Sequence, residues 1–284
     1  MSVSRAAHPV GWQPRLVALD IDGTLLRSDK TISPRTLLAL RAARERGARL
    51  VLVTGRRLPA ARRAAAALGD VDLVLHNGAL IVENGQVLRC RPFSRELSRE
   101  AIRIGRALGA DPVVHAGQKG EGRLLVEGVR PSNTLLAYYV EKSHPDVVQV
   151  DDLETALDDD PLQVMFGGDA ALMEELLPRL ASGLGAPARI ERTVYPERGV
   201  GILDVLAPGV NKAEAVAFLQ RRWQVTAPET LAVGDNWNDR EMLQEAGLGM
   251  VMGNADPGLR ALFPVLPTND EDGVAVAVER YVLA

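Results

Sequence analysis

Cysteine is almost absent from this sequence of 284 residues, since Cys90 is the only one. A single cysteine cannot form a disulfide within the chain, and it gives no sign of an oxidising compartment. It also excludes a cysteine-rich metal site. We therefore expect any bound metal to be held by oxygen ligands.

Long apolar runs and an excess of basic charge are missing as well. No stretch reaches the ~18 apolar residues of a membrane span, and residues 1–14, which we expect to be a frayed leader, lack the apolar centre of a signal peptide. The net charge of −4 and the pI near 5.7 argue against nucleic acid as the main partner. These absences favour a cytoplasmic protein without a membrane partner.

What is present is a globular composition and one distinctive stretch near the N-terminus. Residues 16–19 are an apolar run typical of a strand buried on both faces of a parallel sheet. Asp20 and Asp22 follow, two residues apart, so in an extended chain their carboxylates lie on one side and repel each other unless a cation binds. Gly23 then lets the chain turn over a ligand. An ordinary loop of turn-forming Asp and Gly residues would have the same sequence. Other parts of the chain must therefore decide between a ligand site and a simple turn.

Strands and helices alternate around this stretch. Strand-like segments at residues 16–19, 48–53 and 73–75 are separated by helical ones, and the alternation resumes at Asn211. Short connections of this kind indicate a Rossmann-like, doubly wound parallel sheet, an α/β fold.

The middle of the chain has a different pattern, which opens with a hairpin signal at Asn84-Gly85. Its expected helices are 94–108, 133–141 and 169–182, and its expected strands are 123–127, 162–166, 189–194 and 201–206. This mixture predicts an α+β insert with an antiparallel sheet. We therefore predict a core domain of residues 1–84 and 208–284, with an inserted cap domain of residues 85–207.

Four polar stretches stand where a doubly wound sheet places its ligand site. They are residues 20–24, Thr54-Gly55-Arg56, Lys212 and residues 234–239. Each alone has a structural explanation, as a turn, a solvated helix residue or a helix cap. Together, at the carboxyl ends of strands, they predict one shared site.

This set of motifs resembles the haloacid dehalogenase superfamily of aspartyl-phosphate-forming phosphatases, and within it the Cof-type sugar-phosphatase branch with a large inserted cap. The resemblance covers residues 16–283, and one departure is Ala213-Glu214 after the lysine, where a small Gly is common. The matching motifs are Asp20-x-Asp22-Gly23-Thr24, Thr54-Gly55-Arg56, Gly209-Val210-Asn211-Lys212, Gly234-Asp235-x-x-Asn238-Asp239, Met252-Gly253-Asn254-Ala255 and Asp272-Gly273-Val274-Ala275.

The resemblance implies a role for each core residue. Asp20 would be the nucleophile, and Asp22 would protonate the leaving oxygen and later activate water. Mg²⁺ would be bound by Asp20, the Asp22 backbone carbonyl and Asp235, with Asp239 behind them or as an alternative ligand. The phosphoryl oxygens would be bound by Thr54, Gly55, Lys212, Asn238 and the backbone N–H of Ile21.

The expected function is Mg²⁺-dependent hydrolysis of small phosphate monoesters. The resemblance implies sugar phosphates, because caps of this size in the family exclude macromolecules, with phosphorylated cofactors such as flavin mononucleotide or pyridoxal phosphate as the other substrates. The few aromatic side chains of the cap disfavour these cofactors, because a planar ring is usually held by stacking. A phosphomutase on the same core, or a catalytically silent metabolite-binding or regulatory protein, remains an alternative. The partner is a small phosphorylated metabolite, and we expect a monomer or a weak homo-oligomer.

Other polar residues are weaker candidates. We expect His76 to be structural, Asn77 to form a turn and His8 to lie in the leader. Seven residues of the insert are expected at its surface, and for the first four of them contact with the substrate is the alternative: His115, Gln118, Lys119, His144, Arg192, Tyr195 and Arg198.

Overall fold

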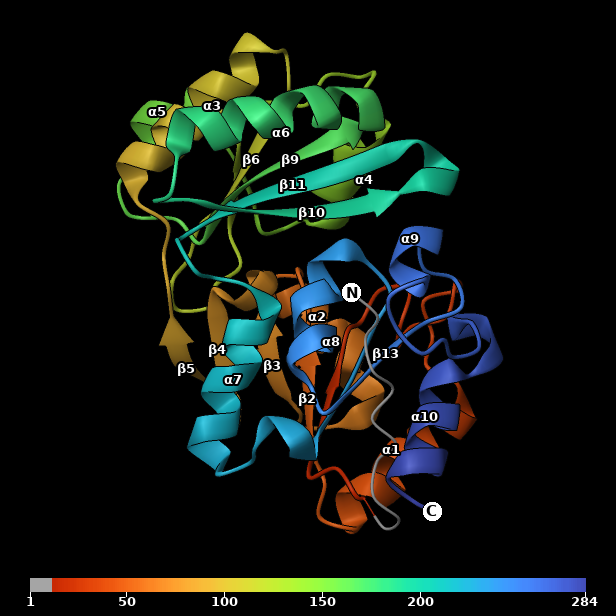
Figure 1. Ribbon diagram of the computed structural model, residues 1–284. Coiled ribbons are helices and arrows are strands. Elements are labelled where there is room, and N and C mark those ends of the chain that lie inside the picture. The colour runs from red at the N-terminus through yellow and green to blue at the C-terminus, as the bar shows by residue number, and fades with distance from the viewer. Residues whose placement is uncertain (1–11) are drawn as a thin grey trace. The chain divides into compact units, whose positions relative to one another are not determined.

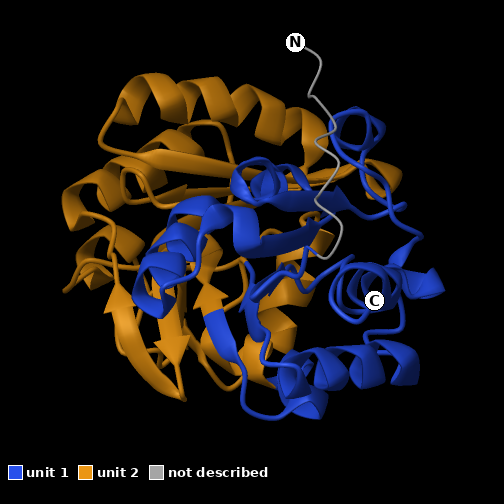
Figure 2. Ribbon diagram, turned by 60° about the horizontal axis from the view of Figure 1, so that its bottom comes forward, with its two compact units in different colours: residues 1–54, 63–73, 212–284 blue, residues 55–62, 74–211 orange. Residues whose placement is uncertain are grey.

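The computed structural model describes residues 12–284 and divides them between two compact units (Figure 2). His8 and most of the predicted leader lie outside the described residues. Of the described residues, the first unit holds 12–54, 63–73 and 212–284, and the second holds 55–62 and 74–211. The core and cap boundaries at 84/85 and 207/208 stay a prediction. Within the described part of the chain, no helix has the length and apolar character needed to cross a membrane.

The first unit is built on parallel strands. Strand β1 (Leu16–Leu19) pairs in parallel with β2 (Arg49–Val53) on one side and with β12 (Thr230–Gly234) on the other, and β12 pairs with β13 (Leu248–Val251). Within this unit the strand order is therefore β13-β12-β1-β2. Strand β3 (Asp72–Leu75) lies at the boundary between the two units. All four residues of β1 are buried. The predicted parallel α/β sheet is confirmed.

Helices cover this sheet (Figure 1). Helix α1 (Pro34–Glu45) begins as its sequence predicts, because Ser33 caps it by accepting a hydrogen bond from the Thr36 N–H. It packs beside α10, and α7 packs beside α8. The remaining bounds are α7 (Lys212–Trp223), α8 (Arg240–Glu245), α9 (Pro257–Arg260) and α10 (Gly273–Tyr281). Helix α2 (Leu58–Ala65) is divided between the two units after residue 62.

The second unit contains a hairpin and a six-stranded sheet. The predicted hairpin consists of β4 (Leu80–Glu83) and β5 (Gln86–Cys90), and the positive φ of Asn84 and Gly85 forms its turn. The sheet has the order β10-β11-β9-β6-β7-β8, and among the strand pairs of these described residues only β7 with β8 is parallel. Its strands are β6 (Pro112–His115), β7 (Leu124–Val126), β8 (Val147–Gln149), β9 (Gln163–Asp169), β10 (Arg189–Tyr195) and β11 (Val200–Leu206). The antiparallel character was predicted, whereas β6 and β8 were not.

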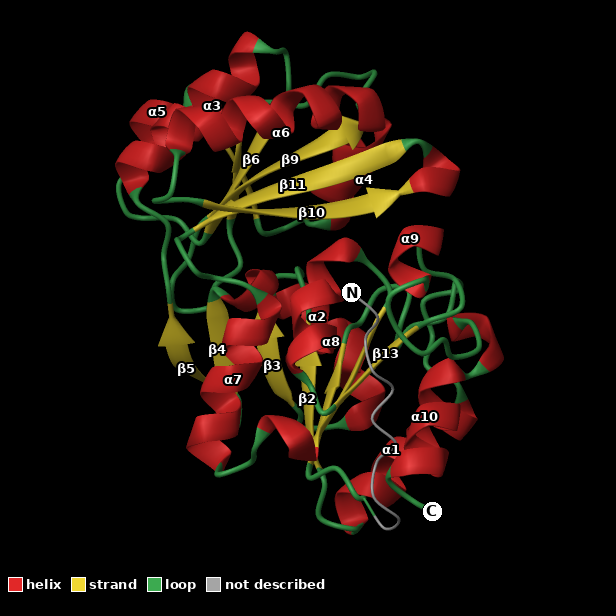
Figure 3. Cartoon of the chain, viewed as in Figure 1, coloured by secondary structure: helices red, strands yellow, loops and turns green. Residues whose placement is uncertain are grey.

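Helices lie on both faces of this second sheet (Figure 3). Phe166 of β9 packs against Gly105, where a Cβ would lie 2.1 Å from the ring. Its neighbour Met165 points the other way and joins a buried cluster with Leu136. The helices are α3 (Arg95–Ala107), α4 (Thr134–Lys142), α5 (Leu153–Ala156) and α6 (Ala170–Leu184).

Candidate active site

Three parallel strands of the first unit bring polar residues to one edge of the sheet. Asp20 follows β1, Thr54 follows β2, and Asp235 follows β12. The carboxyl ends of parallel strands share an edge, so the three residues begin the loops of a single site. Asp20 and Thr54 are buried.

A buried lysine joins two of the carboxylates at this edge. Lys212 is the first residue of α7, and its Nζ donates a hydrogen bond of 2.6 Å to Asp20 Oδ1 and another of 2.6 Å to Asp239 Oδ1. Only 1% of the Lys212 side chain is exposed, so its ammonium depends on these two carboxylates for stabilisation. The interpretation of Lys212 as a solvated helix residue is therefore wrong.

Burial and mutual repulsion shift the acid–base behaviour of this cluster. Burial raises the pKa of Asp20 to about 7, although the Lys212 ammonium lowers it. Burial, with the Asp20 and Asp239 charges, also raises the pKa of Asp235 well above its ordinary value. Burial alone would lower the pKa of Lys212, but the two carboxylates outweigh it and raise the pKa. Three carboxylates sharing one ammonium favour binding of a further cation.

The carboxylate oxygens differ in how far they are already engaged. Both oxygens of Asp239 have protein donors, because Oδ1 accepts from Lys212 and Oδ2 accepts from the backbone N–H groups of Asp235 and Asn236 at 3.0 Å. Asp235 Oδ1 accepts from Thr24 Oγ1 at 2.7 Å. Oxygens of Asp20, Asp235 and Asp239 lie within 4.8 Å of one another, a set of hard ligands that fits Mg²⁺. Both oxygens of Asp239 are thus engaged by protein donors, and metal binding by Asp20 and Asp235 stays a prediction.

The turn after Asp20 requires the glycine at its centre. Gly23 has a φ of +79°, and a Cβ there would lie 2.3 Å from Asp235 Oδ2. The Asp22 side chain is one-third exposed, with Lys30 Nζ 3.6 Å from its Oδ1. Asp22 is therefore more exposed than the buried cluster, and its role in proton transfer stays a prediction.

The other residues predicted to bind the phosphoryl group can be located in the structure, but their role is not tested by it. Ile21 is buried, Asn238 lies buried in the turn after β12, and Gly55 begins the second unit. Their hydrogen bonds to a phosphoryl group stay a prediction, as does that of Thr54. Sequence reasoning gave Thr24 no role, although its position in the first motif was a signal.

The histidine predicted at the surface of the insert is buried. His115 ends β6, and its Nδ1 lies 3.2 Å from Nδ1 of His76, which is also buried. Tyr139 packs on the other side of His115. The expectation for His115 was wrong because β6, which buries it, was not recognised. Gln118, Lys119, His144, Arg192 and Arg198 are exposed, and Tyr195 is partly buried.

Asn77, at the end of β3, follows His76 with a φ of +52° and forms the expected turn. It is fully buried, and its Nδ2 donates to Asp204 Oδ2 at 2.9 Å. A buried side chain with a protein acceptor supports the structural interpretation.

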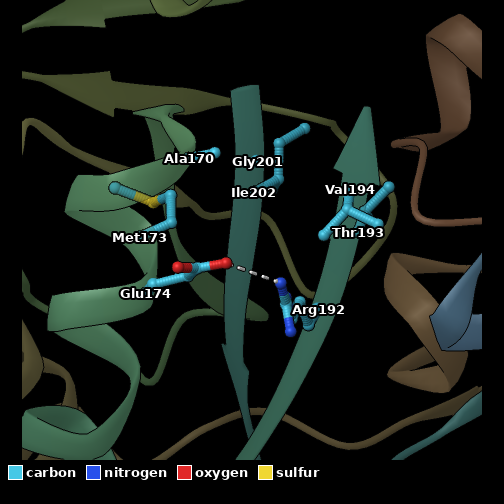
Figure 4. Close-up of a pocket in the computed structure, with 8 residues that line it drawn as sticks. All are labelled: Ala170, Met173, Glu174, Arg192, Thr193, Val194, Gly201 and Ile202. Carbon is cyan, nitrogen blue, oxygen red and sulfur yellow. Dashed lines mark hydrogen bonds and ion pairs between the residues drawn. The ribbon is translucent and has the colours of Figure 1, made fainter. Parts of the chain in front are cut away.

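A small hollow lies in the second unit between α6 and the strands β10 and β11 (Figure 4). Met173 forms part of its wall, and Arg192 reaches Glu174 at 3.4 Å beside it. Its volume of about 10 Å³ holds roughly one water molecule. It is too small for a phosphate ester.

Comparison with known proteins places the chain in a family. Residues 17–278 match the model of the haloacid dehalogenase-like hydrolases. The HMP-PP phosphatase of Cronobacter sakazakii is 32% identical over 89% of this chain and 89% of its own length. An Escherichia coli 5-amino-6-(5-phospho-D-ribitylamino)uracil phosphatase is 26% identical over 94% of this chain and 95% of its own.

A solved structure agrees. The haloacid dehalogenase-like hydrolase of Bacteroides thetaiotaomicron matches with a TM-score of 0.78 and 26% identity over 94% of this chain and 99% of its own. Family and fold agree with the resemblance, so this chain belongs to the haloacid dehalogenase-like hydrolases.

Proposed function

We propose that this protein hydrolyses small phosphate monoesters through a phosphorylated Asp20, with Mg²⁺ as its cofactor. The observation that carries the proposal is the arrangement of Asp20, Lys212, Asp235 and Asp239 at the carboxyl edge of the parallel sheet. The relatives named as phosphatases support the reaction class.

In this reaction Asp20, Asp22 and Lys212 each have a distinct chemical task. An oxygen of Asp20 attacks phosphorus while the ester P–O bond breaks, and Asp22 donates a proton to the departing oxygen. Asp22 then takes a proton from water, which attacks phosphorus of the acyl phosphate and releases inorganic phosphate and the Asp20 carboxylate. Lys212 stays bonded to Asp20 and Asp239 and offsets negative charge near the phosphoryl group.

Mg²⁺ would be held by carboxylate oxygens of Asp20 and Asp235 and by the backbone carbonyl of Asp22. When bound, it supplies the positive charge that lets a phosphate dianion approach a carboxylate. Asp239 supports this set indirectly by holding Lys212 and the backbone of Asp235.

Sugar phosphates are the substrates we favour, with a broad profile. Phe93 and Phe166 are fully buried, and Tyr139 packs on His115, so these rings do not offer a free face for stacking. Tyr138 is 60% exposed, and Tyr195 is partly buried. A planar ring is usually held between aromatic or apolar faces, which are few here.

A phosphorylated pyrimidine derivative is the second candidate. It is favoured by a different observation, namely that a relative 32% identical is an HMP-PP phosphatase and that another relative is a phosphatase of a uracil derivative. The two candidates differ in the leaving group, while the chemistry at Asp20 is the same.

A screen of purified protein against phosphorylated metabolites tests both candidates. We expect phosphate release from several hexose and pentose phosphates with Mg²⁺, and loss of release in Asp20→Asn. Asp70→Asn, which changes an exposed carboxylate of the same unit, is the control and should behave as wild type. A pyrimidine phosphate turned over about a hundredfold better than every sugar phosphate would favour the second candidate. Isomerised sugar phosphate without phosphate release would indicate a phosphomutase, and no turnover a silent binding protein.

The same proposal includes the compartment and the assembly state of the protein. We expect a cytoplasmic enzyme that acts on small metabolites as a monomer or a weak homo-oligomer. Gel filtration with light scattering measures the assembly state.

A further inference from the structure

Residues 21–31, here called the Asp22 loop, follow β1 and are folded back on themselves. The Leu26 N–H donates to the Ile21 carbonyl at 2.9 Å, and Asp22 and Leu26 form an isolated bridge. The Asp22 side chain is one-third exposed and comes within 3.6 Å of Lys30 Nζ, a distance too long for a strong hydrogen bond. Asp22 is carried by this loop, so a shift of the loop backbone moves its carboxyl group as well.

Two asparagine side chains donate hydrogen bonds to backbone carbonyls of this loop, one on either side of its turn. Asn254 Nδ2 donates to the Gly23 carbonyl at 2.8 Å, and Asn269 Nδ2 donates to the Leu26 carbonyl at 2.8 Å. The two asparagines are joined to each other, because the Asn269 N–H donates to Asn254 Oδ1 at 3.0 Å. We call this pair the amide clamp.

The amide clamp is itself fixed to the sheet that carries the active site. Met252 follows β13, and its N–H donates to the Gly234 carbonyl at 3.0 Å, next to Asp235. Gly253 lies so close to the chain before Asn269 that a Cβ would be 2.9 Å from the Leu266 carbonyl oxygen. The clamp therefore ties the Asp22 loop to the same strand edge as Asp235.

The far end of the loop is tied to the same C-terminal segment by different chemistry. Ser28 donates to Asp270 from its N–H at 2.9 Å and from its Oγ at 2.6 Å, and Arg27 pairs with Asp272 at 2.9 Å. These links are charged, whereas the amide clamp is neutral and lies nearer to Asp22 in the chain. Removing the clamp changes how the loop is held without removing a charge.

We infer that Asn254 and Asn269 are positioning residues that hold the Asp22 loop so that Asp22 can protonate the leaving group. The inference rests on the proposed function, in which the Asp22 proton passes to the ester oxygen as the P–O bond breaks. General acid catalysis requires hydrogen-bond reach to that oxygen, and a small displacement is costly. It also gives a task to the late motif at residues 252–255, which contains Asn254 and which the chemistry at Asp20 left unexplained.

The test compares two substrates that differ in their need for a proton. The leaving group of an alkyl phosphate is a basic alkoxide, which needs a proton from the general acid. The leaving group of p-nitrophenyl phosphate is a stable phenolate, which hardly needs that proton. We expect Asn254→Ala and Asn269→Ala each to lower kcat/KM about tenfold for the alkyl phosphate, the scale of one lost hydrogen bond, and by less than about twofold for the aryl ester. Asp22→Asn should show the same selectivity to a greater degree.

Arg35→Ala is the matched control. It removes a surface ion pair with Glu279 that joins two other segments of the same unit, at 2.6 Å, and should leave both rates unchanged. Equal losses on both esters in the two clamp variants, or no loss on either, would overturn the positioning role, and thermal unfolding identifies a variant that loses activity by failing to fold. If only one clamp variant folds, the positioning role is judged from that variant's loss of kcat/KM on the alkyl phosphate relative to its loss on the aryl ester. A wild-type protein that hydrolyses neither ester refutes the proposed function, and the inference with it.

Discussion

His76 and His115 in the second unit make a pH dependence of stability that can be worked out in sign and size. Both side chains are buried and meet through their Nδ1 atoms at 3.2 Å. Burial lowers the pKa of His76 to about 3, and burial with the neighbouring His76 holds the pKa of His115 well below its ordinary value. The His76 imidazole is therefore neutral in the folded protein at pH 5 to 7.

The unfolded chain behaves differently, because a free imidazole takes up a proton below a pH of about 6.5. The unfolded state then binds more protons than the folded state, so stability falls as the pH falls from about 6.5 towards the folded pKa of about 3. The slope is about 1.4 kcal/mol per pH unit for each histidine. Between pH 7 and pH 5, His76 should cost about 2 kcal/mol of folding free energy.

A histidine variant isolates this contribution from the acidic cluster. Asp20, whose pKa is raised to about 7, stabilises the folded state as the pH falls, so the total pH dependence mixes opposite signs. His76→Asn keeps a side chain that tolerates the left-handed φ of +50° and removes the titrating group. We expect the stability difference between wild type and His76→Asn to change by about 2 kcal/mol between pH 7 and pH 5.

Chemical denaturation at several pH values measures this difference, and imidazole ¹⁵N chemical shifts report the charge of His76 directly. Tyr139→Phe is the control, because it removes the hydroxyl near His115 and leaves both histidines in place. The reasoning is refuted if His76 becomes charged between pH 5 and 7 in the folded protein, or if His76→Asn keeps the wild-type slope.

Three further predictions concern the active site. Gly23→Ala should reduce both activity and Mg²⁺ affinity at least tenfold, because its Cβ would lie 2.3 Å from Asp235 and the residue must hold a positive φ, which costs about 1–2 kcal/mol; wild-type kinetics and Mg²⁺ titration would contradict this. Lys212→Met should abolish turnover and lower the free energy of unfolding by about 3–5 kcal/mol, because Asp20 and Asp239 lose their buried ammonium; unchanged denaturation curves would count against the cluster. Chelation by EDTA should stop phosphate release and added Mg²⁺ should restore it, with a Tm that rises with Mg²⁺ concentration; a Tm and a rate indifferent to Mg²⁺ would exclude the proposed cofactor.

The sequence was sufficient to predict what depends on order along the chain. Asp20 and Asp235 follow apolar runs of strand length, and parallel pairing necessarily brings such strand ends to one edge. The hairpin at Asn84-Gly85 is equally local, because two residues with positive φ determine it.

Contacts between distant segments could not be predicted in the same way. His115 was expected at the surface, yet pairing of β6 with β9 and contact with His76 bury it. The hydrogen bond to Asp239 Oδ1 comes from Lys212, 27 residues earlier, and the hydrogen bond from Asn254 to the Gly23 carbonyl spans 231 residues. Such partners are set by tertiary packing and have no periodicity that a sequence displays.

Trapping of the phosphorylated enzyme tests the central claim most directly. Acid quenching during turnover, followed by borohydride reduction, converts a phosphorylated aspartate to homoserine, which peptide mass spectrometry locates. The account predicts homoserine at position 20, and none there in Asp20→Asn or without substrate. Phosphate release that continues with no modified residue, or with the modification at another carboxylate, would contradict it.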